Sequence, residues 1–199
     1  MSFFTSDRER RLWIWTLVVV AAIYSTLGPA QLLVAMLRER NLLRISFALI
    51  LVMIGIAIIW RWIKQPPGWW ELGVLLAAAA VYTFAFIRVE TLEERSHLIE
   101  YSLVAILIYQ ALLERARQGR HVPYPVALAF GASVALGFLD EGIQAILPKR
   151  VFDLVDVGFN ALAAFMAIVV SMALRWARGL RFRDLRTRLK TGNRESKSN

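Results

Sequence analysis

Long apolar runs separated by short clusters of charge are the feature that most constrains this chain. Crossing a hydrocarbon core of about 30 Å takes ~20 residues of helix. Hydrophobic residues make up 58% of the sequence, above the roughly 45–50% of soluble domains. Six segments reach or approach the spanning length: Leu12–Leu27, Ile45–Ile63, Trp69–Ile87, Leu98–Leu113, Pro125–Leu147 and Leu154–Arg175. The pattern predicts an all-α protein, a polytopic transmembrane helical bundle of about six spans.

Turn-forming residues divide these spans. Pro66-Pro67-Gly68 marks a turn between the second and third spans. Gly28-Pro29 interrupts the first apolar run, and residues 29–41 leave open whether an interfacial helix follows it. We expect three parts: an N-terminal pair of helices in residues 1–66, a four-helix transmembrane domain in 67–177, and a basic cytoplasmic tail in 178–199.

Basic residues are concentrated after the last span. The formal net charge is +9, and nine of the 24 Lys and Arg lie between Arg175 and Lys197. A basic segment beside a membrane span suits anionic lipid headgroups. Nucleic acid is not an expected partner, because no basic patch with interleaved aromatic residues accompanies the charge. The polar end, Gly192–Asn199, is predicted to be disordered.

The orientation follows from the distribution of Lys and Arg between the loops. With six spans, 17 of these residues lie on the side that holds both termini and seven lie on the other side. Because positive loops stay in the cytoplasm, we predict that the N- and C-termini are both cytoplasmic. The tail dominates this count. All seven tryptophans fall at span ends on the same side, where indole rings anchor at the interface.

Three groups of polar residues interrupt the apolar pattern in the last three spans. Within each group, helical spacing of three or four residues places the side chains on one face. The groups are His97, Glu100 and Tyr101; Asp140, Glu141 and Gln144; and Arg150, Asp153, Asp156 and Asn160. The predicted topology brings all three to the extracytoplasmic end. Since charged groups in a membrane face one another or water rather than lipid, we predict a carboxylate-rich cleft that opens outward.

Oxygen donors dominate this predicted site. Carboxylates suit a hard divalent cation such as Mg²⁺, Mn²⁺ or Ca²⁺, whereas zinc normally takes several His or Cys ligands. The chain has no cysteine, and His97 is the only histidine on this side. Carboxylates with a histidine also suit general acid–base chemistry. A purely structural network is the competing interpretation, in which Arg95 and Arg150 neutralise carboxylates and Asp153 or Asp156 caps the last helix.

The order of these motifs resembles the VanZ-like family. The matching residues are His97 and Tyr101, then Glu141-Gly142-Ile143-Gln144, then Pro148, Arg150, Asp153, Asp156 and Asn160, within Trp69–Arg175. Two positions depart from the family pattern. Glu94-Arg95 stand where an Asp-Lys pair is common, and Asn160 is followed by Ala161-Leu162 rather than a Gly-Ala pair.

The resemblance implies a multi-pass protein of the bacterial inner membrane. The family is named for a protein linked to resistance to teicoplanin-type glycopeptide antibiotics, which act outside the cytoplasmic membrane. It therefore implies a ligand of the cell envelope: a lipid, a lipid-linked cell-wall precursor or such an antibiotic. Two alternatives stay open. One is a metal-assisted enzyme acting on a lipid-linked substrate, and the other is a non-catalytic assembly partner of another membrane protein.

Overall fold

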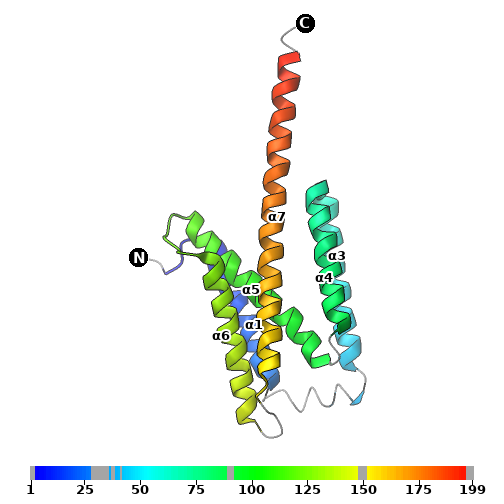
Figure 1. The fold of residues 1–199 in the computed structure, drawn as a ribbon, viewed down its shortest axis with the longest axis vertical. Helices are drawn as coiled ribbons and strands as arrows, with labels where there is room; N and C mark the ends of the chain where they lie inside the picture. The colour runs from blue at the N-terminus through cyan, green and yellow to red at the C-terminus, as the bar shows by residue number, and fades with distance from the viewer. Residues whose placement is uncertain are drawn as a thin grey trace. The chain divides into compact units, whose positions relative to one another are not determined.

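The computed structural model describes residues 3–27, 36, 39–40, 42–88, 92–147 and 152–195. All regular structure in these ranges is helical (Figure 1). The helices are α1 (Asp7–Leu27), α3 (Leu42–Lys64), α4 (Trp69–Arg88), α5 (Leu92–Arg117), α6 (Pro125–Ile146) and α7 (Leu154–Glu195). The predicted all-α class is confirmed. The question of a helix over residues 29–41 falls largely outside the described part of the chain.

Five helices within the described residues are long and apolar enough to cross a membrane. They are Asp7–Leu27, Trp69–Arg88, Arg95–Arg117, Pro125–Ile146 and Leu154–Leu180. The remaining predicted span, Ile45–Ile63, lies within α3, which has 23 residues. Every predicted span therefore coincides with a helix, and the expectation of a membrane protein with transmembrane helices is supported.

Two helix boundaries differ from the predicted ones for local physical reasons. The first helix begins at Asp7 rather than Leu12 because Ser6 caps it: the Glu9 amide donates to Ser6 Oγ over 3.1 Å. At the other end of the chain, α7 continues to Glu195, so the disorder predicted from Gly192 is wrong as far as Glu195. Lengthening an existing helix avoids the cost of nucleating a new one, which allows the polar tail to remain helical.

Packing divides the chain into two compact units that are interleaved in sequence. Unit 1 comprises residues 1–48 and 86–168, and unit 2 comprises residues 49–85 and 169–199. Both are discontinuous in sequence, and the expected division into residues 1–66, 67–177 and 178–199 stays a prediction. Within unit 1, α1 packs against α5 and α6 (Figure 1).

The core of unit 1 is formed by α1, α5, α6 and the first part of α7. Small side chains occupy much of it, including Ala105, Ala129, Ala164 and Ala167, which allow the helix backbones to approach closely. Helices α1 and α5 run antiparallel. The start of α1 meets the end of α5, where Arg115 Nε lies 3.5 Å from Glu9 Oε1.

Unit 2 contains α4 and the later part of α7. Arg178 Nε lies 3.6 Å from Glu71 Oε2, and the rings of Trp70 and Trp176 meet edge to face at 6.5 Å. The start of α4 therefore lies beside residues 176–178 of α7. Trp69, Trp70 and Trp176 are all exposed, as indole rings at a membrane interface are.

Candidate functional site

The last two turns of α6 carry the centre of the polar site. Asp140, Glu141 and Gln144 share one face of the helix and are buried. Asp140 lies six residues before the end of α6, which corresponds to about 9 Å along the helix axis. We name the group formed by His97, Glu100, Tyr101, Asp140, Glu141, Gln144 and Asn160 the His97–Asp140 cluster.

Helix α5 holds Asp140 through two aromatic side chains. Tyr101 Oη donates a hydrogen bond to Asp140 Oδ2 over 2.9 Å, and His97 Nδ1 lies 3.6 Å from the same oxygen. The two rings stack with their centroids 6.0 Å apart. His97 Nδ1 also lies 4.0 Å from Glu100 Oε2. The His-x-x-Glu-Tyr spacing therefore brings His97 and Tyr101 to the Asp140 carboxylate and Glu100 to His97.

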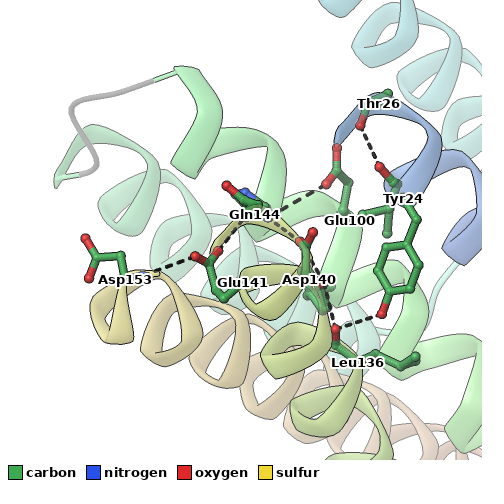
Figure 2. A network of polar contacts seen from close by, with 11 residues as sticks. Tyr24, Thr26, Glu100, Leu136, Asp140, Glu141, Gln144 and Asp153 are labelled. Atoms are coloured by element: carbon green, nitrogen blue, oxygen red, sulfur yellow. Dashed lines mark hydrogen bonds and ion pairs between the residues drawn. The ribbon is translucent and has the colours of Figure 1, made fainter. Parts of the chain in front are cut away.

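Helix α1 joins the cluster through a residue that sequence reasoning missed. The hydroxyl of Tyr24 donates to the Leu136 carbonyl over 2.9 Å, and the hydroxyl of Tyr101 reaches the same oxygen at 3.4 Å. Figure 2 shows Tyr24 pointing toward Leu136, one turn before Asp140. The only signal for Tyr24 in the sequence was a hydroxyl near the end of an apolar span.

Glu141 ties α6 to the segment that leads into α7. Its Oε1 accepts a hydrogen bond from Gln144 Nε2 over 3.0 Å, and its Oε2 accepts one from the Asp153 amide over 3.3 Å (Figure 2). Asp153 Oδ1 in turn accepts the Val155 amide over 2.7 Å. Asp153 therefore caps α7, as one of the predicted alternatives had it, and its side chain is exposed.

Asn160 on α7 is fully buried against α6. Neither its amide nitrogen nor its amide oxygen has a hydrogen-bond partner within the described residues. It packs on Gly137, where an added Cβ would lie 2.9 Å from Asn160 Cβ and 3.4 Å from a ring carbon of Tyr101. A glycine is therefore required at position 137. Sequence reasoning did not single it out, because the need arises from contact between two helices.

The structure brings together seven of the predicted site residues. The seven are the members of the His97–Asp140 cluster. Asp153 contacts Glu141 only through its backbone amide, and Asp156 is half-buried in the first turn of α7. Arg150 and Pro148 lie outside the described residues. One expectation needs correction: Asp140 and Glu141 are fully buried rather than exposed in an open cleft, because hydroxyl, amide and imidazole groups replace water around them.

Three members of the cluster form a candidate metal-binding group. One ligand atom each from His97, Asp140 and Glu141 can be chosen so that all three lie within 4.8 Å of one another. All three residues are buried. This is a narrower donor set than the five carboxylates that sequence reasoning proposed, since Glu100, Asp153 and Asp156 are not part of it.

A second buried polar group lies at the opposite end of α5, and sequence reasoning missed it. Glu9 is fully buried, accepts the Thr5 amide over 2.7 Å and pairs with Arg115. Glu114 accepts Ser6 Oγ over 3.3 Å and lies 3.6 Å from Arg8. We name Thr5, Ser6, Arg8, Glu9, Glu114 and Arg115 the Glu9–Glu114 cluster. Its sequence signal was opposite charges at two span ends predicted to share a side.

Comparison with family models, with curated proteins and with solved structures finds no match to this chain. The resemblance to the VanZ-like family accordingly rests on the motif residues alone.

Proposed function

We propose that this chain is a VanZ-like protein of the bacterial inner membrane that binds a cell-envelope ligand at its His97–Asp140 cluster. The burial of Asp140 and Glu141 inside a membrane bundle carries the proposal. Placing an ionised carboxylate in such a setting costs several kcal/mol. Apolar residues of similar size would stabilise the bundle at least as well. Ionisable groups buried inside a membrane bundle are best explained by a ligand that they bind.

The antiparallel packing of α1 and α5 supports a count of six spans. Two spans that run antiparallel must be separated by an even number of other crossings. Helix α4 lies between them in sequence and has the length and hydropathy of a span. The 14 residues between α1 and α3 are too few for a crossing of ~20 residues. A crossing by helix α3 would supply the even number that this packing needs.

This topology places the two polar clusters of unit 1 on opposite sides of the membrane. The Glu9–Glu114 cluster shares its side with the basic tail, which the distribution of Lys and Arg assigns to the cytoplasm. The His97–Asp140 cluster then lies at the outer-leaflet end. Single cysteines at Ser96 and Gln118 in the cysteine-free chain test this arrangement. Labelling of residue 96 from outside intact cells is expected, and labelling of residue 118 from outside would contradict it.

The charge of the cluster indicates which part of the ligand enters it. The cluster as defined contains three carboxylates, on Glu100, Asp140 and Glu141, one histidine and no lysine or arginine. A surplus of negative charge favours a positive group, either on the ligand or as a bound cation. The surrounding lipid-facing helices suit an amphiphile. An envelope lipid, a lipid-linked precursor and a glycopeptide-type antibiotic all have this character.

A metal-assisted enzyme acting on a lipid-linked substrate is a second candidate. The observation that favours it is the donor group of His97, Asp140 and Glu141. A metal ion so placed could polarise a phosphoryl oxygen or activate water. Turnover of a lipid-linked substrate by the purified protein would distinguish this function from binding alone.

Mass analysis of lipid extracts from the purified protein tests the binding function. Wild type should carry a species that Glu141→Gln has lost, because the substitution removes a charge and leaves the side-chain volume unchanged. Glu71→Gln is the matched control, since Glu71 is a buried carboxylate of unit 2. Identical extracts from wild type and Glu141→Gln would contradict the proposal.

A further inference from the structure

We propose that His97, Asp140 and Glu141 bind one divalent metal ion within unit 1. The ion lies inside the site of the proposed function and deepens that proposal, but it can be measured in the absence of any envelope ligand. Failure of metal binding would leave ligand binding intact as a hypothesis, and failure of ligand binding would leave the metal site intact.

The spacing of the three donor atoms allows all three to bind the same metal ion. They lie within 4.8 Å of one another. Two ligands on opposite sides of one ion are separated by about 4 to 5 Å, given metal–ligand distances of roughly 2.0–2.6 Å. The separation of the three donor atoms is therefore compatible with their binding one ion. They come from two helices, α5 and α6, that pack directly against each other.

Unpartnered polar atoms at the same place are the second observation. His97 Nδ1 is buried and makes no hydrogen bond within the described residues, although it faces Asp140 Oδ2 at 3.6 Å. The Asn160 amide is fully buried, and neither of its polar atoms is hydrogen-bonded in the described part of the chain. Asn160 packs against Gly137, on the α6 face that carries Asp140 and Glu141 one turn later.

The hydrogen bonds around the two carboxylates resemble the support that metal ligands receive. Tyr101 Oη donates to Asp140, and Gln144 Nε2 donates to Glu141. Outer groups of this kind fix the orientation of ligating carboxylates. A divalent cation would also balance the negative charge that Asp140 and Glu141 carry as metal ligands. A bound cation would therefore explain why two neighbouring carboxylates are both buried.

The donor chemistry favours Mn²⁺. Carboxylate and amide oxygens suit Mg²⁺, Ca²⁺ and Mn²⁺, whereas imidazole nitrogen suits the transition metals. Mn²⁺ belongs to both groups. A single histidine with two carboxylates also lacks the several nitrogen or sulfur ligands of ordinary zinc sites.

Titration of the chelator-treated, detergent-purified protein with Mn²⁺ alone tests the site, with free Mn²⁺ measured by electron paramagnetic resonance. Wild type should bind about one Mn²⁺ per chain. Asp140→Asn and His97→Gln should lose this binding. Tyr101→Phe keeps the ring and removes only the hydroxyl, and its affinity should fall about 10- to 100-fold.

Glu114→Gln is the matched control, because Glu114 is a buried carboxylate on α5 at the opposite end of unit 1. It should bind Mn²⁺ as wild type does. Absence of stoichiometric binding to wild type would overturn the proposal even if every variant failed to fold. Equal binding by wild type, Asp140→Asn and His97→Gln would overturn it as well.

Discussion

The two ends of α5 hold buried carboxylates in contrasting surroundings. In the Glu9–Glu114 cluster, both carboxylates lie within ion-pair distance of arginines, with Arg115 beside Glu9 and Arg8 beside Glu114. In the His97–Asp140 cluster, the hydrogen bonds to Asp140 and Glu141 come from a hydroxyl, a side-chain amide and a backbone amide. The first arrangement compensates charge and serves stability. The second has neutral hydrogen-bond donors on Asp140 and Glu141, and a histidine, His97, 3.6 Å from Asp140, where the first has arginines.

Ser6 gives the Glu9–Glu114 cluster a further structural role. It caps α1 through the Glu9 amide and donates its own hydroxyl to Glu114 on α5. A single residue therefore starts one helix and attaches it to another. The contrast with Asn160 is direct, since the polar atoms of Asn160 make no hydrogen bond in the described part of the chain. The Glu9–Glu114 cluster has a gap of its own, since Glu9 Oε1 makes no hydrogen bond within the described residues and lies 3.5 Å from Arg115 Nε.

The largest expected effect is that of Gly137→Leu, which would break the His97–Asp140 end alone. A Cβ at this position already lies 2.9 Å from Asn160 Cβ, so the rest of the side chain must force α6 and α7 apart. We expect a loss of about 3 kcal/mol in the free energy of unfolding, measured by denaturation in a single detergent. Gly131→Leu is the control, because nothing lies within 4 Å of a Cβ there. Equal destabilisation by both would refute the close contact.

Arg115→Met should produce the next largest effect, at the opposite end. Methionine keeps the apolar stem but leaves the fully buried Glu9 without its arginine, so we expect a loss of about 1–3 kcal/mol. Arg115 is 31% exposed, which keeps the loss below that of a fully buried pair. Arg117→Met, whose arginine is 55% exposed and 4.0 Å from Glu114, should change stability by under about 0.5 kcal/mol. Retained Mn²⁺ binding in Arg115→Met would sharpen the contrast between the clusters.

Tyr24→Phe should have the smallest effect of the three. It removes the 2.9 Å hydrogen bond to the Leu136 carbonyl, but Tyr101 Oη remains 3.4 Å from the same oxygen. We expect a loss of no more than about 1 kcal/mol in unfolding free energy. Tyr124→Phe is the control, since Tyr124 is exposed. A double variant with Tyr101→Phe should lose more than the sum of the single losses, because no hydroxyl then reaches the carbonyl. If the loss in the double variant equals the sum of the two single losses, the two hydroxyls do not share the Leu136 carbonyl.

Hydropathy predicted the helices, and helical spacing predicted which polar side chains share a face. Topology predicted that His97 and Tyr101 would lie near Asp140 and Glu141. The first two residues are near the start of one span and the last two near the end of the next, and these two ends lie on the same side of the membrane. The position of α1 did not follow. Helix pairing in lipid depends on close packing and individual hydrogen bonds rather than on hydrophobicity, so neither Tyr24 nor Gly137 could be recognised from the sequence alone.

Capping and burial were predictable only in part. Asp153 was one of two candidate caps, and the choice between it and Asp156 depends on the backbone geometry at the start of α7. Ser6, three residues before Glu9, has the spacing of a helix cap but lies outside the apolar run that defined the predicted span. Whether a carboxylate faces water or a tyrosine hydroxyl is decided by tertiary contacts, which explains why the expected open cleft is a buried cluster.

Glu141→Gln and Glu114→Gln, compared in one experiment with two measurements, test the central contrast most directly. Each substitution removes one buried carboxylate at one end of unit 1. The measurements are the apparent melting temperature and the amount of envelope-derived species in the lipid extract. Glu141→Gln is expected to lose the bound species with little change in melting temperature. Glu114→Gln is expected to retain the species and to melt at a lower temperature. Parallel changes in both measurements for both variants would contradict the division into a structural and a functional end.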